Sequence, residues 1–534
     1  MSLNFDYIVI GAGSAGCVLA NRLSADPNNR VLLLEAGNKD TNIWLHVPVG
    51  YFKTMHNPST DWCYLTEPDP GISDRQLQWP RGKVLGGSSS INGLLYVRGQ
   101  AEDYDRWEAL GNKGWSYQGV LPYFKKSEDQ ERGEDDYHGV GGALKVSDLR
   151  LRREIATRFV NAAQETGIPF NEDYNGATQE GVSYFQQTAH KGFRWSTAKG
   201  FLKDAKKRKN LTVFTRSQVS KLLFDEGDNL KVTGIEFRKD NTLMTATANK
   251  EVILSAGAIN SPQILQCSGI GNGDLLHSLD IPVKHLLPGV GQNLQDHLQI
   301  RLVYKTHLRT LNDELNSWLK QAWVGAQYIL TRTGPLTLAA SQVTVFTRSN
   351  DKVERPDIQF HMQPLSADKP GEGVHPFSAF TSSVCQLRPH SRGHLNIKSP
   401  DPFEYPEIYP NYLSDERDCE VAVNSIKIAR NITNAPSLAD VIEDEFVPGN
   451  QFQTDDQLLE AARLYSQTIY HPTSTCKMGH DEFAVVDERL RVHGVQGLRI
   501  ADASIMPEIV SGNTNAPSIM IGEKAADMIL EDNR

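Results

Sequence analysis

Short uninterrupted apolar runs mark the N-terminal part of the chain. Residues 6–10 (DYIVI) and 30–34 (RVLLL) each hold four consecutive apolar positions, and a third run follows at 251–255. Runs of this kind are typical of parallel strands that are buried on both faces. A helix is predicted over residues 14–24, between the first two runs. The order strand, helix, strand indicates a doubly wound, Rossmann-like unit.

The pattern changes between about residues 306 and 464. Residues 312–330 repeat apolar positions at helical spacing and include two tryptophans. Alternating segments then predict strands at 341–348, 356–363, 380–388 and 394–398. They indicate a second unit, an antiparallel sheet with helices on one face. The tryptophan-bearing helix is expected in a core or an interface. A membrane-surface helix is the lesser interpretation, because its polar face is not notably basic.

These patterns predict an α/β fold, α+β overall, with two units. A chain of 534 residues exceeds the usual size of one hydrophobic core. A third amphipathic helix is expected at about 517–530, near the C-terminus. The predicted boundaries are 1–304 and 484–534 for a nucleotide-binding domain, with inserted cap segments around 38–79 and 150–210, and 305–483 for a substrate-binding domain.

Composition excludes several classes of protein. The net charge is −10 and no basic run stands out, which argues against a nucleic-acid partner. The six cysteines are scattered without a C-x-x-C pair, so we expect reduced thiols, and neither a disulfide framework nor a metal site. No signal-peptide pattern and no transmembrane run are evident. A cytoplasmic location is therefore expected.

The first predicted strand ends in a G-x-G-x-x-G fingerprint. Gly11 permits a tight turn, Gly13 lets the backbone approach a pyrophosphate, and Gly16 packs the helix onto the strand. The N-terminus of that helix then faces the phosphates. The second strand ends in Glu35, an acid that can accept hydrogen bonds from an adenosine ribose. An ADP-containing dinucleotide is expected on Gly11, Gly13, Ser14, Ala15, Gly16, Glu35 and Ala36.

Further motifs carry a family resemblance. They are PRGKVLGGSSSING at 80–93, GAINSPQILQCSGIG at 257–271, YHPTSTCKMG at 470–479 and GNTNAP at 512–517. With the fingerprint, they resemble the glucose–methanol–choline (GMC) oxidoreductases, FAD-dependent enzymes that oxidise alcohols. Within that family the segments CVLANRLSADP, VSDL and YPNYLSDERD are most similar to bacterial alcohol dehydrogenases of alkane oxidation. Choline dehydrogenases are the nearest competitors.

The resemblance implies a catalytic pair, His471 and Asn513. Neutral imidazole can take the hydroxyl proton of an alcohol at neutral pH, and the amide of Asn513 can hold the oxygen while the flavin takes the hydride. No other histidine is nominated, and His297 is taken as structural. The further FAD contacts implied are Arg81, Val84, Gly86, Gly87, Ser88, Asn92, Gly93, Val219, Ala256, Asp502, Ala503, Asn515 and Pro517. The substrate contacts expected are Tyr470, Tyr51, Phe360 and Met362.

Two positions depart from the family pattern. In some relatives a histidine before the Asn-Gly of the second motif anchors FAD covalently, whereas this chain has Ile91, so non-covalent FAD is expected. The family commonly has Val-Gly-Thr after the catalytic His-Pro, and Ser474 here replaces that glycine. This exchange restricts the backbone.

The expected reaction is oxidation of a primary aliphatic or aromatic alcohol to the aldehyde, with electrons passed to a quinone or other acceptor. Peripheral contact with the inner membrane is compatible with that acceptor. The alternatives are an alcohol oxidase that uses O₂, a choline dehydrogenase, and a flavin-dependent lyase or decarboxylase. A flavin-containing scaffold that docks to a membrane or partner belongs to a different class.

Overall fold

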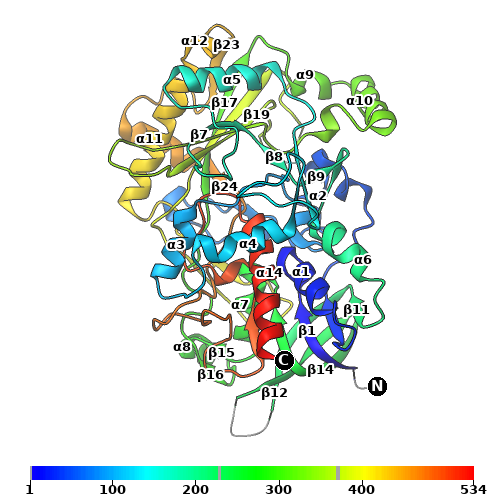
Figure 1. Cartoon of the computed structure of the whole chain (residues 1–534). Coiled ribbons are helices and arrows are strands. Elements are labelled where there is room, and N and C mark those ends of the chain that lie inside the picture. The colour runs from blue at the N-terminus through cyan, green and yellow to red at the C-terminus, as the bar shows by residue number, and fades with distance from the viewer. Residues whose placement is uncertain (1–2, 226–229, 369–372) are drawn as a thin grey trace.

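Two seven-stranded sheets dominate the computed structural model, which describes residues 3–225, 230–368 and 373–534. They lie toward opposite ends of an elongated molecule (Figure 1). In the first sheet β1 pairs in parallel with both β2 and β14, and β14 pairs in parallel with β25. The strand order is β11 (Leu211–Phe214), β2 (Val31–Leu34), β1 (Leu3–Ile10), β14 (Thr242–Leu254), β13 (Val232–Lys239) and β12 (Ser217–Phe224), with β25 (Leu498–Ile500) beside β14.

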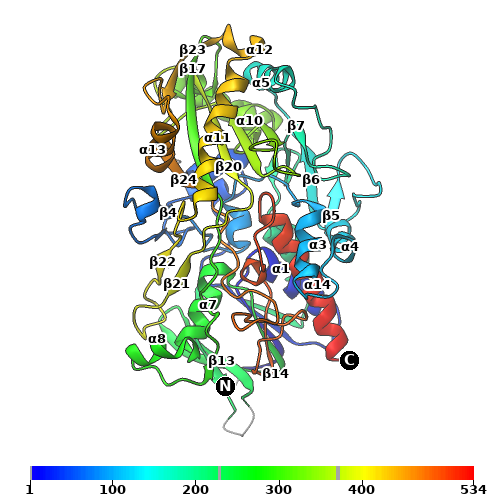
Figure 2. The ribbon, with the colours of Figure 1, turned by 90° about the vertical axis from the view of Figure 1, so that its left-hand side faces the viewer.

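The Rossmann-like prediction is confirmed by this sheet. The predicted strands at 6–10, 30–34 and 251–255 are β1, β2 and the end of β14. The helix that follows the fingerprint is α1 (Ser14–Leu23). It lies beside α14 (Asn515–Asp532), the C-terminal helix, in both views (Figures 1 and 2).

One helix starts earlier than its proline suggests. α7 (Gly257–Cys267) begins directly after β14, which places Pro262 inside the helix rather than at its start. Proline has no N–H to donate to the carbonyl four residues before it, here that of Ala258. The Thr475 hydroxyl donates to this carbonyl instead, at 2.6 Å, so the acceptor stays satisfied.

The second sheet is antiparallel throughout, as the alternating segments at 341–348, 356–363 and 380–388 predict. The predicted strand at 394–398 lies outside it, as β21 (His394–Asn396) in a separate two-stranded sheet. One face is apolar and forms a core with α5 (Glu154–Glu165), α11 (Glu416–Thr433) and α13 (Asp455–Tyr465). The strand order is β23 (Ile442–Val447), β17 (Leu298–Thr306), β20 (Ala379–Gln386), β19 (Ile358–Gln363), β18 (Val343–Thr347) and β7 (Gly181–Tyr184), with β24 (Ser466–Thr468) beside β17.

The alternation along β19 corrects two predicted substrate contacts. Phe360 and Met362 are fully buried in the apolar core between the sheet and its helices. Because neighbouring side chains of a strand point to opposite faces, His361 and Gln363 face the other side, where they line a cavity. The expectation that Phe360 and Met362 touch substrate is therefore wrong, because these two side chains face away from the cavity.

The sheet also bears on the predicted domain boundary. Residue 305 falls inside β17, so the chain enters the second sheet before the predicted boundary. β7 and α5, from the predicted cap segment around 150–210, belong to this sheet and its helical layer. The exact division into domains stays a prediction.

The tryptophan-bearing helix lies on the surface. Residues 312–330 form two helices, α9 (Leu311–Leu315) and α10 (Trp318–Thr331), and α10 is at the edge of the molecule in Figure 1. Within α10 only Val324 and Tyr328 are buried. Trp318 is 75% exposed and Trp323 is 73% exposed, so the helix is not part of the core, and its expected place in an interface stays a prediction. No helix in the described ranges has the length and apolarity needed to cross a bilayer.

The other described elements are short. The helices are α2 (Tyr51–Thr54), α3 (Ala101–Ala109), α4 (Tyr117–Ser127), α6 (Lys203–Ala205), α8 (Gly273–Ser278) and α12 (Pro436–Ala439). The small sheets are β3 (Tyr64–Leu65) with β4 (Gln78–Trp79), β9 (Ala189–His190) with β10 (Phe193–Arg194), β15 (Ile270–Gly271) with β16 (His285–Leu286), β21 (His394–Asn396) with β22 (Glu407–Tyr409), and β6 (Leu144–Asp148) between β5 (Glu128–Gln130) and β8 (Gln186–Gln187).

Candidate active site

A long cavity connects the two sheets. At one end it is lined by the carboxyl ends of β1 and β2, and at the other by the polar face of β17 and β19. Ligands of parallel sheets bind at the carboxyl ends of the strands. The cavity therefore places a nucleotide-binding edge and a second, chemically different wall in one space.

Two helix N-termini open into the nucleotide end of this cavity. α1 has Gly13 and α14 has Thr514 at its N-cap, neither cap residue accepts a side-chain hydrogen bond, and neither helix carries an acid in its first turn. The Ser14 hydroxyl donates to the side-chain oxygen of Asn515 at 2.7 Å, which joins the two ends. Free N–H groups and two positive dipole ends suit a pyrophosphate.

Glu35 closes the same end. One of its carboxylate oxygens accepts from the Ala12 N–H at 3.0 Å and the other from the Gly37 N–H at 2.9 Å. Burial raises the pKa of this carboxyl to about 7, although both hydrogen bonds and Lys83 lower it. Its remaining lone pairs face the cavity, where a ribose diol can donate to them. These residues fit an ADP-containing cofactor.

Most of the predicted cofactor residues line the cavity. They are Gly11, Gly13, Ser14, Ala15, Glu35, Ala36, Arg81, Gly87, Ser88, Asn92, Gly93, Val219, Ala256, Asp502, Ala503 and Asn515. The segment at 80–93 reaches the fingerprint directly, because a Cβ on Gly87 would lie 2.7 Å from the Gly13 Cα. The second motif is therefore packed backbone to backbone against the fingerprint.

Four predicted cofactor residues lie outside the cavity lining. A Cβ on Gly16 would meet the Gly11 carbonyl oxygen at 1.9 Å, so this glycine serves the packing of α1 on β1. The Gly86 N–H donates to the Ala12 carbonyl at 2.7 Å. Val84 belongs to a small buried apolar cluster, and Pro517 is buried within α14. These four position the lining rather than form it.

The predicted catalytic pair is in direct contact. Asn513 donates through Nδ2 to Nε2 of His471 at 3.1 Å, and both residues line the cavity. On its other side, Nδ1 of His471 lies 3.0 Å from Nδ1 of His297, and Nε2 of His297 lies 2.9 Å from the Leu387 carbonyl oxygen.

This chain of hydrogen bonds assigns the tautomers of both histidines. The Leu387 carbonyl can only accept, so His297 carries its proton on Nε2 and accepts on Nδ1. His471 then carries its proton on Nδ1, and its Nε2 is an unprotonated acceptor facing Asn513 and the cavity. His297, expected to be merely structural, thus sets the tautomer of His471, the predicted base.

Burial holds all the histidines of this site neutral. It lowers the pKa of His471 well below 6.5, and the neighbouring His297 and His361 lower it further. Burial lowers the pKa of His297 to about 4, against the hydrogen bond to Leu387. His471 is therefore available as a base across the neutral range.

The backbone on each side of His471 is strained. Tyr470 has φ of 70° and Ser474 has φ of 75°, both in the left-handed region. The Tyr470 carbonyl accepts from the Arg81 guanidinium at 2.6 Å, and the His471 N–H donates to Asp296 at 2.7 Å. Ser474 takes the conformation that the glycine of the family pattern would take freely. Strain of this kind recurs where an active-site group is fixed in place.

Sequence analysis did not indicate His361, which lines the same cavity as His471 and Asn513. It lines the cavity from β19, and burial lowers its pKa to about 3, although Asn513 acts to raise it. Both of its ring nitrogens and the side-chain oxygen of Asn513 are buried without a hydrogen-bond partner in the described chain. Such orphaned groups point to a polar ligand. No motif marks His361, and only the parity of its strand could have suggested it.

Comparisons with known proteins agree with this geometry. The family model for GMC oxidoreductases matches residues 5–299 in its N-terminal part and 389–522 in its C-terminal part. The chain is 44% identical over 528 residues to alcohol dehydrogenase [acceptor] from Pseudomonas putida, covering 98% of this chain and 96% of that protein. It is 43% identical to the mitochondrial choline dehydrogenase of Mus musculus, with 98% and 89% covered.

Solved structures give the same result. Pyridoxine 4-oxidase from Mesorbium loti superposes with a TM-score of 0.88 at 30% identity, over 98% of this chain and 99% of that one. The chain therefore belongs to the GMC oxidoreductase family, as an FAD-dependent enzyme acting on CH–OH groups.

Proposed function

We propose that this enzyme oxidises a primary alcohol to the aldehyde, with His471 as the base and Asn513 as the group that orients the oxygen. The observation that carries the proposal is the unprotonated Nε2 of His471, which faces the Nδ2 of Asn513 at 3.1 Å on the cavity wall. The similarity to an alcohol dehydrogenase [acceptor] over nearly the whole chain supports the same reaction class.

The two side chains divide the work on the hydroxyl. The hydroxyl proton moves to Nε2 of His471, since Nδ1 already holds a proton that it donates to His297. Asn513 cannot take a proton, but its amide N–H groups can donate to the oxygen as negative charge develops there. FAD, when bound, supplies the acceptor for the hydride that leaves the carbon.

We propose that FAD is held without a covalent bond. Ile91 lines the cavity where some relatives carry a histidine, and a saturated side chain has no atom that could attack the flavin. Denaturing the yellow protein with acid should release all flavin into the supernatant. Flavin that stays with the precipitated chain would contradict this proposal.

We further propose that electrons leave to a quinone-type acceptor at a bilayer surface. The apolar outer face of α10 supports this, because a helix exposing two tryptophans suits the interface between lipid headgroups and acyl chains. The charged residues of α10 and its C-cap, Lys320 and Arg332, are both basic, which agrees with an anionic surface.

Replacement of the base tests the reaction. Proposed general-base catalysis predicts that His471→Ala lowers the rate of anaerobic flavin reduction by octanol by roughly 10²- to 10⁴-fold. The matched control is His277→Ala, an exposed histidine in α8, which should reduce at the normal rate. Flavin content measured beforehand separates loss of chemistry from loss of cofactor. An unchanged rate in His471→Ala at full flavin content would remove the mechanism.

Admitting air after this reduction distinguishes an acceptor-dependent dehydrogenase from an oxidase. Slow reoxidation in air with fast reoxidation by a soluble quinone supports an acceptor-dependent dehydrogenase. Fast reoxidation in air with formation of peroxide would contradict the proposed acceptor and indicate an oxidase.

A further inference from the structure

The substrate end of the cavity carries an arginine that forms no ion pair within the described part of the chain. Arg301, on β17, lines the cavity on the same side of the sheet as His361 and Gln363. Its guanidinium donates to the backbone carbonyls of Ala367 at 3.2 Å and Asp368 at 3.3 Å. Among the described residues no carboxylate lies within ion-pair distance of it. Two long bonds to carbonyls leave most of its five donors open.

The carboxylates that line the cavity are engaged at the other end. In the described lining these are Glu35, which accepts from backbone N–H groups beside the fingerprint, and Asp502. Asp502 accepts from the Gly257 N–H at 2.9 Å, the Ser261 hydroxyl at 2.6 Å and the Ser504 N–H at 2.8 Å. The described lining near Arg301 therefore offers no carboxylate, either to the guanidinium or to a cationic substrate.

The other arginine of the lining differs from Arg301. Arg81 donates to the carbonyls of Pro80 and Tyr470 at 2.6 Å each, and the acids Asp296 and Asp61 act on it. Arg301 makes longer bonds to its carbonyls, and among the described acids Asp368 acts on it, although the Asp368 carboxylate lies 3.0 Å from His375 and does not line the cavity. A buried guanidinium with so few partners is unfavourable unless an anion joins it. A planar guanidinium binds carboxylates through two parallel hydrogen bonds.

The sheet register fixes the spacing between Arg301 and the catalytic pair. Arg301 pairs with Ser383 of β20, and Ser383 pairs with His361 of β19. Arg301 and His361 thus stand in register two strands apart, a backbone separation of about 10 Å. His361 is next to Asn513 and His471. A substrate held at both places needs its two functional groups at the ends of a medium-length chain.

We propose that Arg301 binds a carboxylate at the end of the substrate opposite to the hydroxyl, so that the preferred substrates are ω-hydroxy carboxylates. This rests on the proposed function and names its substrate class. The hydroxyl-bearing carbon loses a hydride to the flavin and the hydroxyl loses a proton to His471, giving the aldehyde, while the carboxylate is unchanged. A cationic alcohol such as choline is repelled by the same guanidinium.

Steady-state specificity tests the proposal. The wild-type enzyme should have a higher kcat/KM for ω-hydroxyoctanoate than for octanol, and little or no activity on choline. In Arg301→Gln the ratio of kcat/KM for ω-hydroxyoctanoate to that for octanol should fall by roughly 10- to 100-fold, as expected for loss of a charged hydrogen-bonded pair. The control Arg348→Gln, half-exposed at the end of β18, should keep the wild-type ratio.

A binding measurement gives a readout that does not depend on turnover. Octanoate, which carries the carboxylate but no hydroxyl, should bind the holoenzyme in calorimetry. The substitution Arg301→Gln should raise the Kd for octanoate by a similar 10- to 100-fold. Arg301→Lys should keep part of the affinity, because lysine keeps the positive charge but cannot form the two parallel hydrogen bonds of a guanidinium.

The outcomes separate this proposal from the one on which it rests. Octanol that bleaches the flavin while ω-hydroxyoctanoate is no better, with an unchanged ratio in Arg301→Gln, would overturn the carboxylate site alone. A flavin that neither alcohol bleaches would instead overturn the proposed reaction. Efficient oxidation of choline by the wild-type enzyme would also overturn the carboxylate site.

Discussion

At the scale of single residues, the proposed base, His471, predicts how the reaction depends on pH. His471 must be neutral to accept the hydroxyl proton, and burial lowers its pKa well below 6.5. We expect kcat/KM for a neutral alcohol to be level from pH 8 down to below about 6.5, the ordinary histidine value, and to fall only in more acidic buffers. Stopped-flow flavin reduction across this range checks it. An acid limb at or above the ordinary value would contradict the buried, neutral base.

His297 offers a second test at this scale. Its Nδ1 accepts the proton of His471 Nδ1, so we propose that it is a positioning residue that acts through His471. In His297→Phe that proton has no acceptor and the tautomer of His471 is no longer fixed, so we expect kcat to fall by roughly 10- to 100-fold with a smaller change in KM. His297→Asn, which can accept through its amide oxygen, should recover part of the rate. Equal losses in both variants would indicate a packing role only.

The residues of the site were predictable to different degrees. His471 and Asn513 lie in motifs, and the structure brings them to 3.1 Å from one another. His361, in contrast, is one position from Phe360 in a strand of apolar and polar alternation. Which face of a strand meets a cavity depends on its pairing and on the layer that covers it, and the local pattern contains neither.

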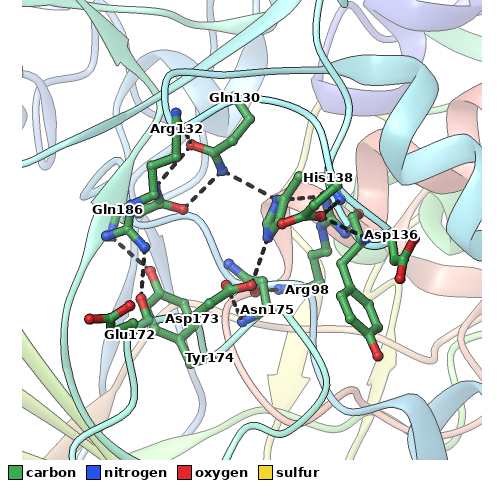
Figure 3. A network of polar contacts seen from close by, with 12 residues as sticks. Arg98, Gln130, Arg132, Asp136, His138, Glu172, Asp173, Tyr174, Asn175 and Gln186 are labelled. Carbon is green, nitrogen blue, oxygen red and sulfur yellow. Dashed lines mark hydrogen bonds and ion pairs between the residues drawn. The ribbon is translucent and has the colours of Figure 1, made fainter.

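At the scale of elements, the buried side chain of His138 bonds to two acids from different segments near α4. Figure 3 shows His138 between Gln130, Arg98 and Asp173. Its Nδ1 lies 3.1 Å from Glu128 and its Nε2 2.9 Å from Asp173, and these carboxylates raise its pKa to about 9 although burial lowers it. Asp135 also lies near, but both ring nitrogens are already paired with acids, so His138 is a charged partner and carries no free lone pair for a metal.

The raised pKa of His138 predicts how stability varies with pH. The folded form holds the proton more tightly than the unfolded form, so its contribution is complete below pH 6.5 and is lost as the pH rises through 9. We expect the free energy of unfolding to fall by up to about 3 kcal/mol over this range. His138→Gln should be less stable at pH 6 and should lack this slope. Parallel curves for both proteins in denaturant titrations would refute the prediction.

The exposed helix α10 predicts a membrane interaction. Trp318→Ser with Trp323→Ser should reduce cosedimentation with vesicles that contain anionic lipid, because the two indoles are the largest of the exposed apolar side chains of α10, which also include Leu319, Ile329 and Leu330. Leu286→Ser, equally exposed on β16 at the far end of the molecule, should bind as the wild type does (Figure 1). Failure of the wild type to bind such vesicles would exclude this role for α10.

Periodicity could not place this helix. Apolar positions occur nearly all round α10, so the pattern predicts a helix but does not say which side is covered. In the structure the covered side is the one that carries Val324 and Tyr328. The hydroxyl of Tyr328 donates to the Gly192 carbonyl at 2.9 Å, which holds this side inward.

At the scale of the whole molecule, most of the order of helices and strands could be predicted from the sequence, but the way in which they assemble could not. The strand–helix–strand segment and the alternating strands appear where the patterns place them. The second sheet, however, takes β7 from a stretch predicted as a cap segment and begins β17 before the predicted boundary. Such pairings join segments far apart in the sequence, and short patterns carry no information about which strands will meet.

The cavity is lined by segments from both ends of the chain. A cofactor bound there should therefore stabilise the whole fold against unfolding. Residues 11–36, 80–93 and 502–515 all contribute to its lining. A ligand at 100 times its Kd stabilises the native state by about 2.7 kcal/mol. We therefore expect the Tm of flavin-free protein to rise steadily with added FAD.

Two glycines of the fingerprint separate folding from this cofactor effect. A Cβ on Gly13 meets nothing closer than 4.0 Å, so Gly13→Val should fold as the wild type does while its side chain occupies the space of the pyrophosphate. A Cβ on Gly11 would lie 2.4 Å from the Ser255 carbonyl oxygen, at φ of 98°. Gly11→Ala should therefore lower the Tm without FAD, and Gly13→Val should keep that Tm but lose its rise with FAD. If Gly13→Val still gains the full rise, no phosphate passes over this turn, and the assignment of the nucleotide end fails.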